Sequence, residues 1–430
     1  MKQFQASSDH HHQKSHSKII ALLIPIFLFF TIIPLLGPLQ HYPLKSYFHF
    51  RASPTPSQVT ASEGLSIKLT QNCDLFSGEW VRNFKAPYYT NATCWAIHEY
   101  QNCMKYGRPD TDYLKWRWQP DGCDLPVFNP AQFLEMVRDK SMAFVGDSVG
   151  RNHMQSLMCL LSRVDYPVDE SHTSDEQFKR WKYKTYNFTL ATFWTPHLVR
   201  TESLDSTNPT LPKIHHLYLD EHDENWTTQI EDFSYVIISG GHWFFSPMVY
   251  HEEGQVVGCH YCQDPNVPDL KLYYGYRKAM RTALKAINGL KNYKGITFLR
   301  TFAPSHFENG AWNQGGDCVR KRPYRSNETS LEASTLEIYM TQIEEFKVAE
   351  REGNRRGLKF RLMDVTQPML LRPDGHPSKY GHWPNGTHVT LHNDCVHWCL
   401  PGPIDNWNDF LLEMLKMEGR RAYDEKYSRN

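Results

Sequence analysis

A serine that follows a short apolar run has the pattern of a nucleophile. Residues 142–145 are apolar, Gly146-Asp147-Ser148 comes next, and residues 154–161 then carry apolar side chains at helical spacing. This order predicts that Ser148 lies where a strand ends and a helix begins, at the edge of an α/β sheet where ligands bind. Free N–H groups at a helix N-terminus favour an oxyanion. Taken alone, the pattern also fits a serine that only caps the helix.

A serine hydroxyl needs a base, and the base needs a group that orients it. The stronger candidate is Asp394-Cys395-Val396-His397, in which His397 would take the proton of Ser148 and Asp394 would hold the imidazole tautomer. Cysteines at 395 and 399 would make this loop rigid if oxidised. The pair Asp374 and His376 ranks second, because the prolines around it indicate a rigid loop that could shape the site instead.

Donors for an oxyanion are the next requirement, because negative charge develops on the carbonyl oxygen. The backbone N–H of Ser148 is the first candidate, and Gly240-Gly241 after a second apolar run is the next. The glycine pair also fits a plain tight turn. Arg151 and Asn152 are also placed to donate to the oxyanion.

Cys259-His260-Tyr261-Cys262 resembles half a zinc site, but no second C-x-x-C follows, so a disulfide is expected and no metal.

The elements that must position these residues alternate between strands and helices. We expect strands at 142–145, 235–239, 296–299 and 362–365, helices at 275–289 and 335–351, and a last helix with Asp405 as its N-cap. This alternation predicts an α/β fold with a parallel sheet covered on both faces. Residues 73–135 have little periodicity and are interpreted as loops tied by disulfides. Residues 146–150 also fit the G-x-S-x-G elbow of α/β-hydrolases, but too few strands precede them for that fold.

The segment 19–39 has no charged residue and is long enough to cross a bilayer. Lysines precede it, which predicts a cytosolic tail at 1–18, a transmembrane anchor at 19–39, a stem at 40–72 and a luminal domain at 73–424. A cleaved signal peptide is the alternative. Formal net charge is zero, so no bulk attraction to nucleic acid is expected. Ten cysteines indicate disulfides, and five sequons predict glycosylation at Asn91, Asn187, Asn225, Asn327 and Asn385.

Several stretches together resemble the plant trichome birefringence-like family of polysaccharide O-acetyltransferases. Besides Gly146-Asp147-Ser148 and Asp394-x-x-His397, they are residues 72–80, 114–120, 310–318 and 372–377. The resemblance implies an SGNH/GDSL-like three-layer fold, a Ser148–His397–Asp394 triad and a single-pass type II protein of the Golgi membrane. It also implies the disulfides Cys73–Cys123, Cys94–Cys159, Cys103–Cys399 and Cys318–Cys395, which would leave Cys259 and Cys262 to pair.

Residues 102–110 and the cysteines at 259 and 262 are most similar to the xyloglucan-acetylating branch of that family. Our hypothesis is double displacement, in which Ser148 takes an acetyl group and passes it to a polysaccharide hydroxyl. The acetyl donor would be acetyl-CoA or another activated carrier, with no bound cofactor, and a membrane protein that supplies acetyl groups is a candidate partner. Alternatives are a mannan or xylan acetyltransferase, an acetyl esterase, and a glycan-binding scaffold with a vestigial site.

Overall fold

The computed structural model describes residues 73–204, 213–382 and 393–427. The expected tail, transmembrane anchor and stem, together with Asn385, lie outside these ranges. Within them, no helix is long and apolar enough to cross a membrane.

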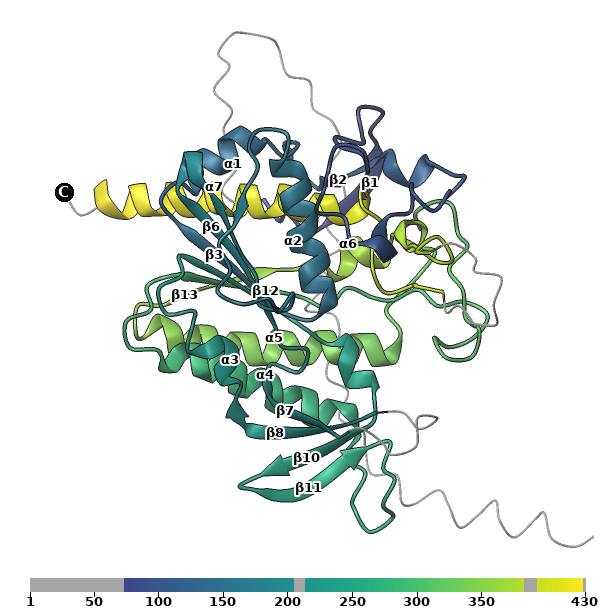
Figure 1. Ribbon diagram of the computed structural model, residues 1–430, viewed down its shortest axis with the longest axis vertical. Helices are drawn as coiled ribbons and strands as arrows, with labels where there is room; N and C mark the ends of the chain where they lie inside the picture. The colour runs from purple at the N-terminus through teal and green to yellow at the C-terminus, as the bar shows by residue number, and fades with distance from the viewer. Residues whose placement is uncertain (1–72, 205–212, 383–392, 428–430) are drawn as a thin grey trace, which may run out of the picture. The chain divides into compact units, whose positions relative to one another are not determined.

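A mixed seven-stranded sheet forms the centre of the described chain, in the order β13-β12-β9-β3-β6-β5-β4 (Figure 1). Strands β13 to β6 of this order run parallel. The expectation of a wholly parallel sheet is wrong at one edge, where β5 and β4 run antiparallel. Only four residues, 184–187, join β5 to β6, and so short a connection permits only antiparallel pairing. The strands are β3 (Ser141–Gly146), β4 (Val168–Asp169), β5 (Arg180–Tyr183), β6 (Phe188–Trp194), β9 (Tyr235–Ser239), β12 (Ile296–Arg300) and β13 (Lys359–Met363).

Helices cover both faces of this sheet, because successive side chains of each central strand point to opposite sides. In β3, Met142 and Phe144 belong to the core formed with α2 and α7, whereas Ala143 and Val145 belong to the core formed with α4 and α5. The result is a three-layer arrangement in which the helices cover the two faces of the sheet but not the ends of its strands. The helices are α1 (Pro130–Met136), α2 (Ser148–Leu161), α3 (Glu224–Thr227), α4 (Lys271–Gly289), α5 (Ala333–Asn354), α6 (Thr366–Leu370) and α7 (Asn406–Tyr427).

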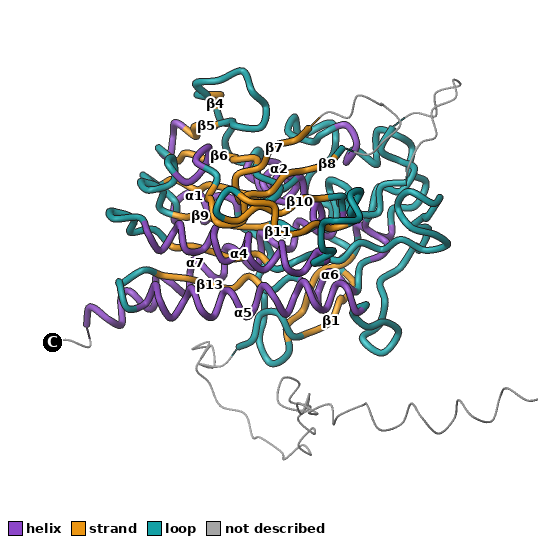
Figure 2. The backbone as a smooth tube through the Cα atoms, turned by 90° about the horizontal axis from the view of Figure 1, so that it is seen from below, coloured by secondary structure: helices purple, strands orange, loops and turns teal. Residues whose placement is uncertain are grey.

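A second sheet, not expected from the sequence, lies outside α4 (Figures 1 and 2). Its strands are β7 (Val199–Leu204), β8 (Ile214–His222), β10 (Met248–Glu252) and β11 (Gln255–His260). The buried positions of β8 alternate, with Leu217 and Leu219 in the same core as α4. Histidine and tyrosine occupy several of the other positions of β8, so the alternation of buried and exposed residues is hidden in the sequence.

The N-terminal portion is more regular than the expected loops. It contains an antiparallel pair, β1 (Gly78–Arg82) and β2 (Trp116–Pro120). Two buried tryptophans hold this pair in place, Trp80 against the body of the protein and Trp118 against the segment that precedes β1. The indole N–H of Trp80 donates to the carbonyl of Pro368 at 2.8 Å, and that of Trp118 donates to Leu75 at 2.9 Å. The cross-strand pair of tryptophans therefore stabilises two strands that the sequence, with its lack of periodicity, did not indicate.

Most expected elements are confirmed within larger ones: 142–145 in β3, 235–239 as β9, 296–299 in β12, 275–289 in α4 and 335–351 in α5. Two expectations need correction. The strand expected at 362–365 lies earlier in the chain: β13 begins at Lys359 and ends at Met363. Asp405 does not cap α7, because its carboxylate accepts from the N–H of Gly402, three residues before it, and from Tyr89 and Ser156.

Candidate active site

The N-terminus of α2 presents Ser148 at the carboxyl end of β3. Asp147 is the N-cap, and its Oδ1 accepts from the N–H groups of Val149 at 3.1 Å and Gly150 at 3.3 Å. Gly146 makes the turn with φ of +148°, where a Cβ would lie 1.8 Å from the carbonyl oxygen of Ser239. Because Asp147 is the cap, the Ser148 hydroxyl is free for another partner.

That partner is His397, which arrives from a loop 249 residues later in the chain. His397 Nε2 lies 2.7 Å from Ser148 Oγ, and Nδ1 lies 2.8 Å from Asp394 Oδ2. The second Asp394 oxygen accepts from the backbone N–H of Val396 and of His397. A carboxylate can only accept, so Nδ1 carries the proton and Nε2 accepts from Ser148. The structure thus brings the three predicted residues together in the order that nucleophilic catalysis requires.

The electrostatics of this group favour an ionised Asp394 and a basic His397. Burial raises the pKa of Asp394, but the charge of His397 and the hydrogen bonds from His397 and Val396 outweigh it and hold the pKa at about 2. Burial lowers the pKa of His397, and the Asp394 carboxylate more than offsets this, so the pKa is raised above its ordinary value of 6.5. An imidazolium formed during a reaction would therefore be stabilised.

Disulfides and an amide clamp hold the loop that carries His397 and Asp394. The cysteines pair as Cys318–Cys395 and Cys103–Cys399 on either side of His397. Asn152 of α2 accepts from the N–H of Trp398 at 2.8 Å and donates to its carbonyl at 3.3 Å. Its amide is engaged there, and this clamp joins the nucleophile's helix to the loop. The other pairs are Cys73–Cys123, Cys94–Cys159 and Cys259–Cys262, so all five match the pairing that the resemblance implies.

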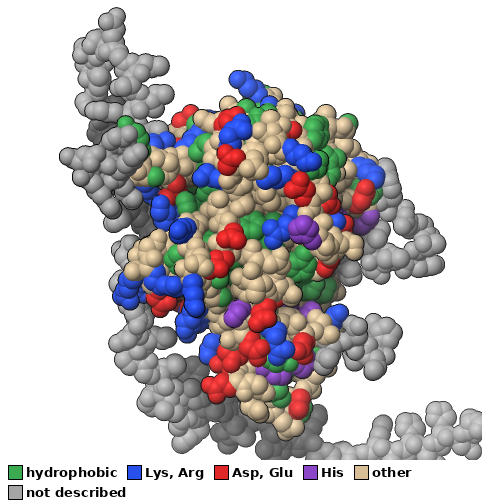
Figure 3. All heavy atoms as spheres, turned by 60° about the vertical axis from the view of Figure 1, so that its left-hand side comes forward, with side chains coloured by type: hydrophobic (Ala, Val, Ile, Leu, Met, Phe, Trp, Pro, Cys, Tyr) green, Lys and Arg blue, Asp and Glu red, His purple; other side chains and the backbone are tan. Residues whose placement is uncertain are grey.

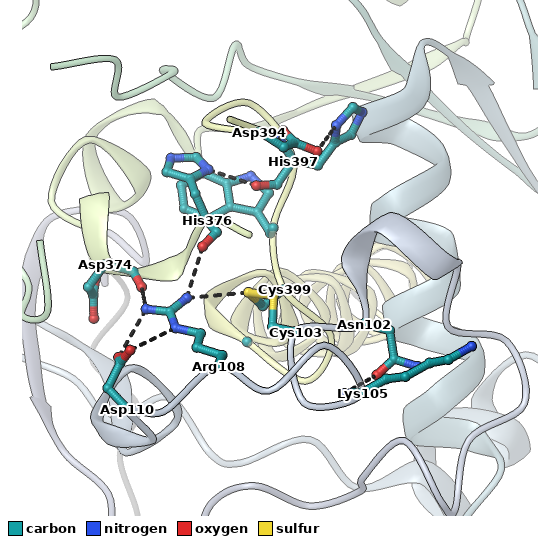
Figure 4. Close-up of a disulfide and its surroundings, with 12 residues drawn as sticks. Asn102, Cys103, Lys105, Arg108, Asp110, Asp374, His376, Asp394, His397 and Cys399 are labelled. Atoms are coloured by element: carbon teal, nitrogen blue, oxygen red, sulfur yellow. Dashed lines mark hydrogen bonds and ion pairs between the residues drawn. A yellow bond between two sulfur atoms is a disulfide. The ribbon is translucent and has the colours of Figure 1, made fainter. Parts of the chain in front are cut away.

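The second-ranked pair, Asp374 and His376, lies near the loop that carries Asp394 and His397 (Figure 4). His376 Nδ1 is 2.7 Å from the carbonyl oxygen of His397, so its N–H holds the main chain of that residue. Asp374 forms a fully buried ion pair with Arg372 at 2.8 Å. Arg108, which sequence reasoning missed as a site residue, donates to the carbonyls of both Asp374 and His376. Its place in the 102–110 stretch, which carries part of the family resemblance, was the available signal.

Comparison with known proteins agrees with this geometry. The PC-Esterase family, described as a GDSL/SGNH-like acyl-esterase family found in Pmr5 and Cas1p, matches residues 125–414. The chain belongs to this family. The PMR5 N-terminal domain matches residues 71–124, which include β1 and β2. An SGNH-like α/β domain with an N-terminal extension is therefore established.

Relatives of this PC-Esterase protein confirm the resemblance to the trichome birefringence-like family. Protein trichome birefringence-like 19 of Arabidopsis thaliana is 59% identical over 407 residues, 94% of each chain. Xyloglucan O-acetyltransferase 4 of Populus trichocarpa is 46% identical, over 81% of this chain and 82% of the relative. Xyloglucan O-acetyltransferase 2 of Arabidopsis thaliana is 42% identical, over 81% of this chain and 84% of the relative.

Backbone donors for an oxyanion lie beside Ser148 in this PC-Esterase site. The Asp147 carboxylate accepts from the N–H groups of Val149 and Gly150, whereas the N–H of Ser148 has no acceptor in the described ranges. Gly240 and Gly241 follow β9, whose last residue pairs with Gly146, and their N–H groups also lack an acceptor there. Gly241 has φ of +155°, and a Cβ would lie 2.6 Å from Phe302, so a glycine is needed at that position.

His242 belongs to the stretch after β9 that the sequence indicated, but no role of its own was predicted for it. Its Nε2 lies 3.0 Å from the carbonyl oxygen of Ala303, and its Nδ1 lies 3.6 Å from Asp147 Oδ2. Burial raises the pKa of Asp147, but His242 and then Arg300 outweigh it, so the pKa is lowered overall and the cap stays ionised. The histidine directly after the Gly240-Gly241 turn was the available signal, because that turn already bordered the predicted site.

The remaining predicted sites lie apart from Ser148. Cys259 and Cys262 form a disulfide, and the described residues contain no group of three or more His, Cys, Asp or Glu side chains placed to hold a metal. Four of the five sequon asparagines are exposed: Asn91, Asn187, Asn225 and Asn327. Their glycosylation stays a prediction.

Proposed function

We propose that this protein is a polysaccharide O-acetyltransferase that acts on xyloglucan through an acetyl-Ser148 intermediate. The observation that carries the proposal is the hydrogen-bonded Ser148–His397–Asp394 array in a member of the acyl-esterase family. Relatives over 40% identical along most of the chain are named xyloglucan O-acetyltransferases, which favours that acceptor.

The first half-reaction forms the acetyl-enzyme. His397 Nε2 takes the proton of Ser148 Oγ while Oγ attacks the acetyl carbonyl of the donor, which is acetyl-CoA or another activated carrier. The N–H groups of Ser148, Gly240 and Gly241 are the proposed donors to the oxyanion. The donor's leaving group then departs and receives the proton from His397. Asp394 keeps the imidazole in the required tautomer and stabilises its charge.

The second half-reaction transfers the acetyl group to the acceptor. A sugar hydroxyl attacks the acetyl-Ser148 carbonyl while His397 takes the hydroxyl proton. The new ester forms, Ser148 Oγ leaves, and His397 returns the proton to it. The protein ends unchanged, so each cycle consumes one donor acetyl group and forms one sugar acetate.

We further propose that the protein is a single-pass type II protein of the Golgi membrane with its catalytic domain in the lumen. Support comes from the uncharged segment at 19–39, the lysines before it, the five disulfides and the exposed sequons. Acidic and basic side chains are interspersed on the face shown in Figure 3.

Mass spectrometry of the purified full chain tests the function. The protein is incubated with acetyl-CoA, and separately with an activated acetyl ester, and then with xyloglucan, mannan and xylan oligosaccharides. We expect an acetyl adduct on the Ser148 peptide that disappears as acetylated xyloglucan oligosaccharide forms. Release of acetate with no transfer would indicate an esterase, and transfer to mannan or xylan would redirect the acceptor. No adduct and no transfer with any donor would overturn the proposal.

The pH dependence of the reaction reports the state of His397. The base must be neutral, and its pKa is raised above 6.5, so kcat/KM should rise with pH through a midpoint above 6.5. Asp394→Asn removes the main group that raises this pKa, so the midpoint should move to lower pH while the plateau falls about 10⁴-fold. An unshifted midpoint in that variant, measured by kcat/KM from pH 4 to 9, would argue against the assigned base.

His376 should act as a positioning residue through the main chain of His397. His376→Ala removes the N–H that holds this carbonyl, and a displacement of about 1 Å at a catalytic group can cost about 10²-fold in kcat. His376→Asn keeps a donor near the Nδ1 position and should recover part of the loss. Steady-state kinetics should show the effect in kcat rather than KM. Equal kcat in both variants would contradict this role.

A further inference from the structure

Two tryptophans flank the turn that carries Ser148. Trp194 ends β6 in register with Gly146, and Trp243 follows β9 on the other side of the same strand. Their rings are 5.8 Å apart and nearly perpendicular, at 87°. Both side chains are partly exposed, and neither indole N–H has a hydrogen-bond partner in the described part of the chain. A partly exposed aromatic pair thus borders the turn that carries the nucleophile, on the sheet edge where ligands bind.

Arg151 lies between this pair and His397. It follows Ser148 by three residues on α2, with its guanidinium carbon 5.1 Å from the centre of the Trp194 ring. Its Nη2 donates to the hydroxyl of Tyr100 at 3.3 Å, and the Tyr100 ring lies 5.0 Å from that of His397. Among the described residues, no carboxylate pairs with Arg151, and its Nη1 has no acceptor. A guanidinium held in place with an unused face is therefore available to a ligand beside the reacting atoms.

The ligand chemistry follows from this combination. A pyranose ring has an apolar C–H face that packs on an aromatic surface, and neighbouring hydroxyl groups whose oxygens accept hydrogen bonds from a guanidinium fork. The transferred acetyl group alone is too small to cover two indoles, whereas the sugar acceptor presents both the apolar C–H face and the hydroxyl groups that this combination binds. We propose that Trp194, Trp243 and Arg151 form the subsite that binds the acceptor sugar ring presented to acetyl-Ser148. This inference rests on the proposed acetyl transfer, and it moves Arg151 from the oxyanion candidates to acceptor recognition.

Separate measurement of the two half-reactions tests the subsite. In Trp194→Ala and Trp243→Ala, KM for a xyloglucan oligosaccharide should rise about tenfold, and the loss should fall on the transfer from acetyl-Ser148 rather than on its formation. Arg151→Lys keeps the charge but loses the planar fork, so it should show the same pattern. Trp181→Ala is the matched control, because Trp181 is partly buried on β5 and pairs with Leu190, away from the end of β6 that carries Trp194. Circular dichroism confirms that each variant is folded.

Three results would overturn the subsite. Equal slowing of both half-reactions in Arg151→Lys would assign this residue to the oxyanion. A loss confined to acetyl-Ser148 formation in the tryptophan variants would assign the pair to the donor. The third is an acceptor KM that is unchanged in Trp194→Ala and Trp243→Ala, or that rises as much in the control Trp181→Ala as in these variants. Calorimetric titration of wild type and Trp194→Ala with the oligosaccharide tests binding even if no acetyl-enzyme forms. Equal affinities would then reject the subsite, while a missing adduct alone would reject only the proposed reaction.

Discussion

Ser148→Ala should lower acetyl transfer by about 10⁴–10⁶-fold without unfolding the protein. In the proposed mechanism the substitution removes the atom that carries the acetyl group. His397 Nε2, which lies 2.7 Å from that atom, is then left with no hydroxyl to deprotonate. The cost to stability should be small. Asp147 rather than Ser148 caps α2, so the helix keeps its N-terminal hydrogen bonds to Val149 and Gly150. The measurement is acetyl incorporation into xyloglucan oligosaccharides, with thermal unfolding as the check on folding.

A serine at the opposite end of the same strand provides the control. Ser141 begins β3, and its hydroxyl faces the backbone of Asp232 and Ser234 rather than the site. Ser141→Ala should leave transfer within about twofold of wild type and remove at most about 1 kcal/mol of stability. Transfer by Ser148→Ala at the rate of Ser141→Ala would show that the array with His397 is not the catalytic one.

The sequence predicts the nucleophile's surroundings well because they are local. The strand–turn–helix around Ser148 follows from an apolar run, a glycine turn and helical spacing, all within about twenty residues. Asp394 and His397 are likewise predictable as a pair, because a carboxylate three residues before a histidine can orient it. That this pair meets Ser148 is a tertiary fact. The residues alone only ranked it above Asp374 and His376, and the resemblance to a family then favoured it.

The elements that were missed depend on contacts between distant segments. Strand β8 is buried at alternate positions only because α4 covers it, and its histidines and its one tyrosine hide that face in the sequence. Strands β1 and β2 are stabilised by Trp80, whose partner Pro368 is 288 residues away. The support that Arg108 gives to the loop before His397 also spans more than 260 residues. Patterns of a single segment cannot report such pairings.

The ion pair of Arg372 and Asp374 should have the largest effect on stability of any single contact near the site. Both side chains are fully buried. Arg372 makes two hydrogen bonds to Asp374, at 2.8 and 3.0 Å, and a third to the carbonyl of Tyr113. Its guanidinium also lies 4.3 Å from the centre of the Trp80 ring. Arg372→Met would leave a buried carboxylate without its cation, which costs about 3–5 kcal/mol in the free energy of unfolding.

A double-mutant cycle with Asp374→Leu distinguishes the loss of a partner from the value of the pair. If an unpaired charge causes the damage, Arg372→Met with Asp374→Leu should be more stable than Arg372→Met alone, since no charge is then left in the core. Arg138→Met is the control, because the Arg138–Glu135 pair is 41% and 59% exposed and should contribute less than about 1 kcal/mol. Chemical unfolding followed by tryptophan fluorescence gives the free energy of unfolding of each variant. A loss in Arg372→Met as mild as that in Arg138→Met would contradict the argument. Recovery in the double variant would show that the unpaired carboxylate, rather than the lost contacts of Arg372, causes the loss of stability.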